Sequence, residues 1–302
     1  EVYASHTFHE VTMYYPMRVV RTRRHKLIWN IAYGLEYPFA SDLWESRTWQ
    51  AVLSRGIEQY GKRSVEAYLH RPKFELYDLG KDPDEVVNLA EDPAHAGTLA
   101  RLRAAHDKWA ADSRDLGLLP EAELNRLGNV HGTRYAVHAA LAAEDPTFWD
   151  TLRTVAALAG AGAPESVMQL LSAAKDSPHP SVRWWAVTGL DTLPAAPREV
   201  RAALLKALGD PLAVVRVAAA AGVVRRMPDD TAPALEVLKA ALADGDEWIR
   251  LQAALALDGL GRRARPALGA LRAAVNDGAN KYVARVANHA VNTLTGETNE
   301  VN

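Results

Sequence analysis

The sequence predicts a chain in two parts: a small α+β unit, with an antiparallel sheet and a packed helix, followed by an all-α solenoid of repeated helix pairs. Two observations support this fold class. The first 130 residues hold 15 of the 22 aromatic residues, whereas the remainder is rich in Ala and Leu. Asp and Arg also recur through the second half at a nearly constant interval. We therefore expect one domain at residues 1–130 and another at residues 131–302.

Three β-rich runs and two helical runs define the first domain. Residues 17–22 and 26–31 read as a hairpin around a basic turn, and residues 74–79 read as a third strand. A loop leads into a short helix around residues 48–53, and residues 98–112 have apolar side chains at helical spacing. The long helix should pack on the sheet. Its expected apolar face comprises Leu99, Leu102, His106 and Trp109.

The segment at residues 74–90 reads FELYDLGKDPDEVVNLA, and its residues suit a strand followed by a turn. In a strand, Leu76 and Tyr77 point to opposite faces. After the turn, Asn88 can hold the backbone through its side-chain amide, and Leu89 returns to the core. The segment therefore predicts a strand followed by a side-chain-stabilised turn.

Four segments of the second half begin with Asp, usually have Pro or Gly close behind, and reach a β-branched residue and then Arg. Asp accepts from free N–H groups at a helix start, and Pro fits the first turn. One helix pair cannot bury its apolar face alone, so such pairs stack. The pattern resembles HEAT repeats. The arginines, spaced by 33, 34 and 35 residues, are Arg183, Arg216, Arg250 and Arg285.

The recurrent Asp and Arg residues have a structural interpretation, because caps and ion pairs can form a ladder along such a stack. We expect this role rather than a catalytic one. Trp184 and Trp185 interrupt the small residues of the solenoid. We expect one ring to fill the core. The other ring faces a groove or the first domain, or packs in the core as well, and core packing is the favoured interpretation.

Residues 74–90 resemble the C-terminal subdomain of sulfatases, in which such a segment ends a small sheet and starts the terminal helix. Upstream, residues 5–18 read SHTFHEVTMYYPMR and resemble the heparan N-sulfatase (N-sulfoglucosamine sulfohydrolase) branch. The resemblance covers residues 1–120 or so. It implies hydrolysis of sulfate esters or sulfamates of glycans, in a periplasmic or extracellular protein.

The chain does not contain the catalytic motif of that family. Sulfatases use a formylglycine made from the first residue of Cys/Ser-x-Pro-x-Arg, together with calcium held by acidic residues. The chain has no Cys, and none of its 16 prolines follows a Ser by two positions. The resemblance therefore implies that formylglycine and calcium belong to an N-terminal domain before Glu1. We expect this chain alone to be inactive.

The resemblance also implies that the run at residues 5–18 borders the active-site pocket. There, His9 and Glu10 could bond sugar hydroxyls, and the planar guanidinium of Arg18 could bind a carboxylate or a second sulfate. The alternatives are that His9 lies in a loop and that Arg18 is an ordinary residue on the sheet surface. His6 and His9 lack a third nearby ligand, so we expect no metal site in this chain.

Charge and hydropathy limit the partners. With 35 basic and 37 acidic residues the net charge is −2, which gives no whole-chain attraction to nucleic acid or to an anionic membrane. No apolar run approaches the roughly 20 residues that span a bilayer. We expect a sulfated glycan, bound through the full-length enzyme, and a protein partner on the solenoid, with no nucleic acid and no membrane. The basic turn at residues 21–26 suits either a polyanionic glycan or a solvated hairpin tip.

A second function is compatible with the same sequence. The solenoid could be a non-catalytic, protein-binding HEAT-repeat module that keeps a sulfatase subdomain only as a remnant. In either case the small sheet should expose one face when no large domain covers it. We therefore expect residues 1–130, expressed separately, to self-associate.

Overall fold

The computed structural model divides the chain into two compact units, Glu1–Leu118 and the residues from Leu119 onward. This boundary lies earlier than the predicted one after residue 130. The reason is α5 (Glu121–Val130), which packs on α6 (Arg134–Glu144) and so belongs to the second unit. The structure describes residues 1–9, 13–34, 37, 43, 46–161 and 163–297.

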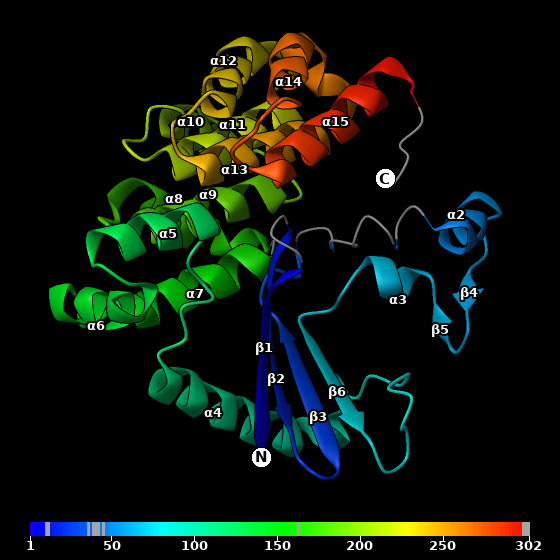
Figure 1. Cartoon of the computed structure of the whole chain (residues 1–302). Coiled ribbons are helices and arrows are strands. Elements are labelled where there is room, and N and C mark those ends of the chain that lie inside the picture. The colour runs from blue at the N-terminus through cyan, green and yellow to red at the C-terminus, as the bar shows by residue number, and fades with distance from the viewer. Residues whose placement is uncertain (10–12, 35–36, 38–42, 44–45, 162, 298–302) are drawn as a thin grey trace. The chain divides into compact units, whose positions relative to one another are not determined.

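The first unit contains a four-stranded antiparallel sheet in the order β1-β2-β3-β6, seen at the blue end of the chain in Figure 1. The predicted hairpin and third strand are confirmed as β2, β3 and β6, whereas β1 is a strand that we did not predict. The turn between β2 and β3 closes on Thr22, whose backbone N–H donates to the carbonyl of His25 at 2.8 Å. The strands span Val2–His9 (β1), Met13–Arg21 (β2), His25–Asn30 (β3) and Phe74–Asp78 (β6).

The long predicted helix is α4 (Ala96–Ser113), which packs against β2 and β3 on one face of the sheet. Its Trp109 ring stacks on Tyr3 with centroids 5.4 Å apart, and His106 meets Trp29 edge-on at 5.1 Å. Each fully buried aliphatic side chain in such a core stabilises the fold by about 1.5–3 kcal/mol. The core between helix and sheet is formed by Val20, Leu27, Leu76 and Leu102, with Leu89 and Leu99 packed against it.

The opposite face of the sheet is only partly covered. Strand register places Met17, Val19 and Ile28 on that face, and all three side chains are half-buried. A small cluster built on α2 (Arg47–Ser54) follows in the chain. It joins α2 to β4 (Gln59–Tyr60), β5 (Arg63–Ser64) and α3 (Glu66–Leu69), and its buried centre is Trp49, Val52 and Val65.

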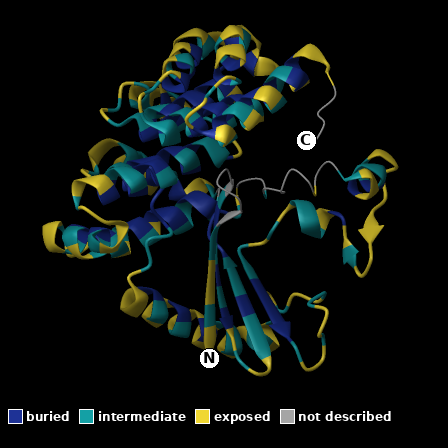
Figure 2. Cartoon of the chain, in the orientation of Figure 1, coloured by how far each residue is buried: buried dark blue, intermediate teal, exposed yellow. Residues whose placement is uncertain are grey.

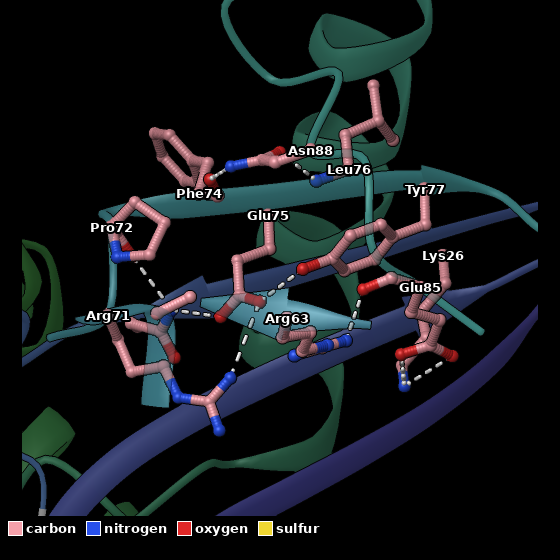
Figure 3. A network of polar contacts seen from close by, with 12 residues as sticks. Lys26, Arg63, Arg71, Pro72, Phe74, Glu75, Leu76, Tyr77, Glu85 and Asn88 are labelled. Carbon is pink, nitrogen blue, oxygen red and sulfur yellow. Dashed lines mark hydrogen bonds and ion pairs between the residues drawn. The ribbon is translucent and has the colours of Figure 1, made fainter. Parts of the chain in front are cut away.

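The turn after β6 is held by a side chain, as the sequence predicts. Asn88 Oδ1 accepts from the backbone N–H of Leu76 at 2.8 Å, and its Nδ2 donates to the carbonyl of Phe74 at 2.9 Å. The amide thus bonds to both backbone groups that flank Glu75, as a neighbouring strand would (Figure 3). Leu76 and Tyr77 point to opposite sides of β6, which agrees with the predicted alternation.

The second unit is a stack of helices. One layer consists of consecutive neighbours α7, α9, α11, α13 and α15, and the other layer consists of α8, α10, α12 and α14. Buried residues line the inside of the stack and exposed residues its outer turns (Figure 2). The bounds are Phe148–Ala161 (α7), Val167–Asp176 (α8), Pro180–Thr192 (α9), Arg198–Ala207 (α10), Ala213–Arg226 (α11), Thr231–Leu242 (α12), Glu247–Gly259 (α13), Leu268–Ala274 (α14) and Lys281–Thr295 (α15).

Small residues allow the helices of the layer that contains α7 and α9 to approach closely. Gly189 of α9 lies so near α7 that a Cβ at this position would be 2.6 Å from the Cα of Ala159. Trp184 and Trp185 of the same helix are both buried, with ring centroids 5.0 Å apart. The burial of both rings agrees with core packing, the favoured expectation.

Candidate functional site

The predicted site residues fall on the hairpin formed by β1 and β2. His9 is the last residue of β1 and its backbone pairs with Met13 of β2. The side chain of His9 and the whole of Glu10 lie outside the part of the chain that the structure describes. The structure therefore places His9 at the end of the hairpin and leaves the sugar-binding prediction for both residues as a prediction.

Arg18 lies inside the first unit, on the face of β2 that α4 covers. It is 1% exposed and binds Asp115 with both arms: Nε to Oδ2 at 2.6 Å and Nη2 to Oδ1 at 2.8 Å. Its Nη1 donates to the carbonyls of Met17 at 2.7 Å and His6 at 3.2 Å. A Cβ on Gly117 would lie 2.0 Å from Nη2, so the glycine is required for this packing.

This burial corrects one of the two interpretations of Arg18. The side chain is not an ordinary residue on the sheet surface, because its guanidinium ties β2 to the segment after α4. Its contact with substrate stays a prediction, and the pairing with Asp115 gives it a structural role in this chain. Burial disfavours the charged form of Asp115, but the hydrogen bonds from Arg18 outweigh it and hold the pKa of that carboxyl below its usual range.

The other face of β6 carries a buried carboxylate, Glu75, which is 3% exposed (Figure 3). It accepts from Asn30 Nδ2 at 2.8 Å and from the hydroxyl of Tyr77 at 2.5 Å, and it lies 3.6 Å from Arg71 Nη1. Burial, and then the hydrogen bond to Glu75, raise the pKa of Tyr77, so its hydroxyl stays protonated and donates. A buried charge is stable only when paired in this way.

The surroundings of Glu75 favour a structural role for this network. Arg63 donates to the backbone carbonyl of Glu85, and its guanidinium lies over the ring of Tyr77 at 5.8 Å from the centroid. Because Glu75 offsets the charge of Arg71, that arginine is engaged within the network. Around Glu75, three buried atoms have no hydrogen-bond partner within the described residues: Tyr15 Oη, Asn30 Oδ1 and Arg71 Nε.

The basic hairpin turn is partly neutralised by its own unit, through two of its four cationic side chains. Arg24 binds Asp78 at 2.8 Å, and Lys26 binds Glu85 at 2.8 Å. The hydrogen bond from Arg24 lowers the pKa of Asp78 to about 2. Of the two interpretations of this turn, the structural one accounts for both contacts.

The recurrent arginines of the second unit form the predicted ladder at two of three steps. Arg183 of α9 binds Asp210 through Nε at 2.7 Å and Nη2 at 3.0 Å. Arg250 of α13 binds Asp277 through Nε at 2.6 Å. Each arginine also donates to two carbonyls in the loop before its own helix. These residues therefore join successive repeats and lock the loops between them.

The middle step of the ladder is different. Arg216 of α11 binds the carbonyls of Asp210 and Pro211, but within the described residues no ion pair joins α11 to α13. The link there is a hydrogen bond from Gln252 Nε2 to the carbonyl of Val214 at 3.0 Å. The middle step thus uses a hydrogen bond to a carbonyl, whereas the two outer steps use ion pairs.

The capping role predicted for the recurrent Asp residues needs a correction. Asp210 and Asp277 lie in the loop and are not the N-cap residues of the following helices, which are Leu212 and Asn280. Asp210 Oδ1 accepts from the N–H of Leu212, and Asp277 Oδ1 accepts from that of Asn280. They therefore shape the turn before the helix and present their carboxylates to the arginine of the preceding repeat.

The described part of the chain shows neither a metal-binding cluster nor a membrane-spanning helix. It contains no group of three or more His, Asp or Glu side chains placed to hold a metal ion. Among the same residues, none of the helices combines the length and the apolar character that crossing a bilayer requires.

Comparison with known proteins agrees with both halves of this architecture. Human (Homo sapiens) N-sulphoglucosamine sulphohydrolase is 38% identical over 117 residues, which are 38% of this chain and 23% of the relative. A family model described as HEAT repeats matches residues 136–223, from α6 into α11. The chain joins a sulfatase-like segment to HEAT repeats. The chain thus spans less than a quarter of the length of this relative.

Two further relatives of the sulfatase-like segment carry other substrate names. An ulvan-active sulfatase of Formosa agariphila is 33% identical over 123 residues, 39% of this chain and 20% of the relative. A Delta 4,5-hexuronate-2-O-sulfatase of Bacteroides thetaiotaomicron is 36% identical over 80 residues, 26% of this chain and 16% of the relative. The sulfatase likeness is therefore shared by proteins named for different sulfated sugars.

Sequence reasoning missed the polar residues that hold the first unit together. Asp115, the partner of Arg18, has no local pattern that would single it out. Glu75 could have been found, because a carboxylate two residues from Tyr77 in a strand shares its face and lies within reach of the phenol.

Proposed function

We propose that this chain is the non-catalytic part of a sulfatase-like hydrolase that hydrolyses sulfate esters or sulfamates of glycans. The observation that carries the proposal is the 38% identity with an N-sulphoglucosamine sulphohydrolase. The small sheet and the Asn88-held turn occur in the segment whose sequence resembles the sulfatase subdomain. The nucleophile belongs to other polypeptide, since no Cys and no Ser-x-Pro-x-Arg occurs among the 302 residues.

The proposal assigns the chemistry to polypeptide outside this chain. A formylglycine there would attack sulfur, and calcium would neutralise the sulfate oxygens. His9 and Glu10, at the end of the β1–β2 hairpin, would bond sugar hydroxyls. In the active native protein, His9→Ala should then raise KM for the sulfated sugar with a smaller effect on kcat.

A comparison of the isolated chain with the native protein tests this function. The purified 302-residue chain should release no sulfate from N-sulfoglucosamine above a buffer blank. The protein captured from source cells by an antibody against this chain should be larger than 33.0 kDa and should release sulfate. A captured native protein no larger than 33.0 kDa and without sulfatase activity would contradict the proposal.

That contrary result would favour the second function, a protein-binding module. HEAT repeats suit protein partners because their stacked helices form extended surfaces. Two large apolar side chains of this region are also strongly exposed, Tyr135 at 80% and Met168 at 74%. A protein that co-purifies with the chain and is lost on Tyr135→Ser and Met168→Ser would identify such a surface.

A further inference from the structure

The most basic part of the solenoid surface lies between α13 and α15. The segment comprises η4 (Gly261–Ala267) and α14, which follow each other without a break. Between residues 259 and 276 the chain has four arginines and no acidic residue. This local charge of +4 contrasts with the net charge of −2 for the whole chain. The arginines are Arg262, Arg263, Arg265 and Arg272.

The helical geometry gathers three of these arginines on one face. Arg262, Arg265 and Arg272 stand at positions i, i+3 and i+10, so they follow one side of the continuous helical segment. The opposite side is buried through Ala264, Ala267, Leu271 and Ala274. The row extends over roughly 16 Å along the axis, from the rises of a 3₁₀ turn and an α-helix. We call these three residues the arginine row.

The arginine row is accessible to solvent, and its charges are not paired within the described residues. All three side chains are exposed, and within the described residues none has an ion-pair or hydrogen-bond partner. Other arginines of the solenoid, such as Arg183 and Arg225, bind carboxylates. Gly269 lies between Arg265 and Arg272 on the same face, and a Cβ there would meet nothing within 4 Å. An extended ligand could therefore lie along the row without a steric obstacle.

We propose that the arginine row binds a sulfated polysaccharide chain and holds it on the solenoid. A guanidinium group offers two parallel N–H donors that match the oxygens of a sulfate or carboxylate. A row of such groups fits a linear polymer with repeated anionic groups better than it fits a single small anion. The choice of a sulfated polysaccharide over other polyanions rests on the proposed function. The row thus acts as a binding surface that uses none of the predicted substrate-contacting residues.

Binding of heparin fragments to the purified chain, measured by calorimetry at low salt, tests this inference. The triple variant Arg262→Gln/Arg265→Gln/Arg272→Gln should bind about tenfold more weakly, because three exposed charge contacts are lost. The control Lys175→Gln/Arg198→Gln/Lys206→Gln removes the same net charge from exposed positions of α8 and α10 and should bind like the wild type. Equal loss in both variants, or no loss in the first, would overturn the proposal.

A second variant and two further ligands sharpen the test. Gly269→Glu places an acidic side chain in open space within the row and should also weaken heparin binding severalfold, while leaving the far-UV circular dichroism unchanged. Desulfated heparin and single-stranded DNA of equal charge should bind at least tenfold more weakly than heparin. Equal affinity for the DNA would show a general polyanion surface and contradict the choice of ligand. Because no turnover is measured, this result is independent of the sulfate-release assay.

Discussion

The buried pairing of Arg18 with Asp115 ties β2 to the segment after α4. Replacing the arginine with methionine keeps its bulk but leaves the mostly buried carboxylate without its ion-pair partner, so that among the described residues only the N–H of Gly117 still donates to it. We expect Arg18→Met to lower the free energy of unfolding by about 3 kcal/mol, as measured by urea denaturation. Arg23→Gln, on the exposed hairpin turn, is the control and should change it by less than about 0.5 kcal/mol. Equal stability of the two variants would show that the pair does not stabilise the unit.

The same pair gives the first unit a pH dependence. The pKa of Asp115 is lower in the folded chain than in the unfolded one. Its stabilising contribution is therefore present at neutral pH and is lost as the pH falls below the ordinary value of the carboxyl, near 4. Arg18→Met should remove part of this acid sensitivity, as urea midpoints measured between pH 3 and pH 7 would reveal.

A second residue-scale prediction concerns Asp78. The hydrogen bond from Arg24 lowers the pKa of this carboxyl to about 2. Arg24→Gln should raise that pKa toward its ordinary value near 4, as followed by carboxyl chemical shifts in an NMR titration. Stability contributed by the contact is complete above pH 4 and is lost as the pH falls through 2. An unchanged titration of Asp78 would exclude Arg24 as the cause.

At the scale of elements, two arginines of the ladder can be compared directly, because one of them lacks the ion pair. Arg216 and Arg250 make the same two contacts to loop carbonyls, but Arg250 alone also binds an aspartate, Asp277. Arg250→Gln should therefore destabilise the solenoid by about 1–2 kcal/mol more than Arg216→Gln, in thermal or urea unfolding. Equal effects would mean that the ion pair itself contributes nothing.

Helix contact in the solenoid depends on a second kind of feature, the small residue. Gly189→Ala would place a methyl group 2.6 Å from Ala159 Cα and should lower stability by about 1–3 kcal/mol, despite the better helix propensity of alanine. Gly259→Ala at the end of α13 meets nothing within 4 Å and should be neutral or stabilising by up to about 1 kcal/mol. Melting temperatures that shift in the same direction would contradict this account.

Elements with a strong local pattern were predictable from the sequence. Alternation in β6 and the helical spacing of α4 identified both elements and the faces that they bury. The strand β1 was missed because its sequence alternates weakly, and it is completed by backbone pairing with β2. The ladder was predictable in kind, since Asp and Arg recur at the repeat interval. The altered middle step was not, because it depends on the exact positions of two loops.

At the scale of the whole molecule, the partly covered face of the sheet bears on solubility. Val19 and Ile28 are directly opposed on that face. Residues 1–130 expressed alone should self-associate, and Val19→Lys/Ile28→Lys should shift sizing chromatography toward the monomer. Val87→Lys, at a valine that is 58% exposed outside this face, should have no such effect. A monomeric profile of the unmodified fragment would refute the expectation.

The whole molecule also shows where sequence reasoning about function ended. The resemblance of residues 5–18 and 74–90 to sulfatases pointed to proteins that the comparison also found, since part of this chain is 38% identical to an N-sulphoglucosamine sulphohydrolase. It could not assign Arg18, since a buried arginine and a substrate-binding arginine look alike in sequence. Its partner, 97 residues away, is brought to it only by folding. The contact of Arg18 with substrate stays a prediction.

The uneven ladder gives the solenoid a graded response to ionic strength. Screening by concentrated salt weakens an attraction between opposite charges, but it hardly affects an amide that donates to a carbonyl. In molar sodium chloride the junctions between α9 and α11 and between α13 and α15 should loosen, while the Gln252 junction keeps its strength. Amide hydrogen exchange should then become faster at these two junctions than at the Gln252 junction between them. At high salt the solenoid would therefore open first on either side of its centre.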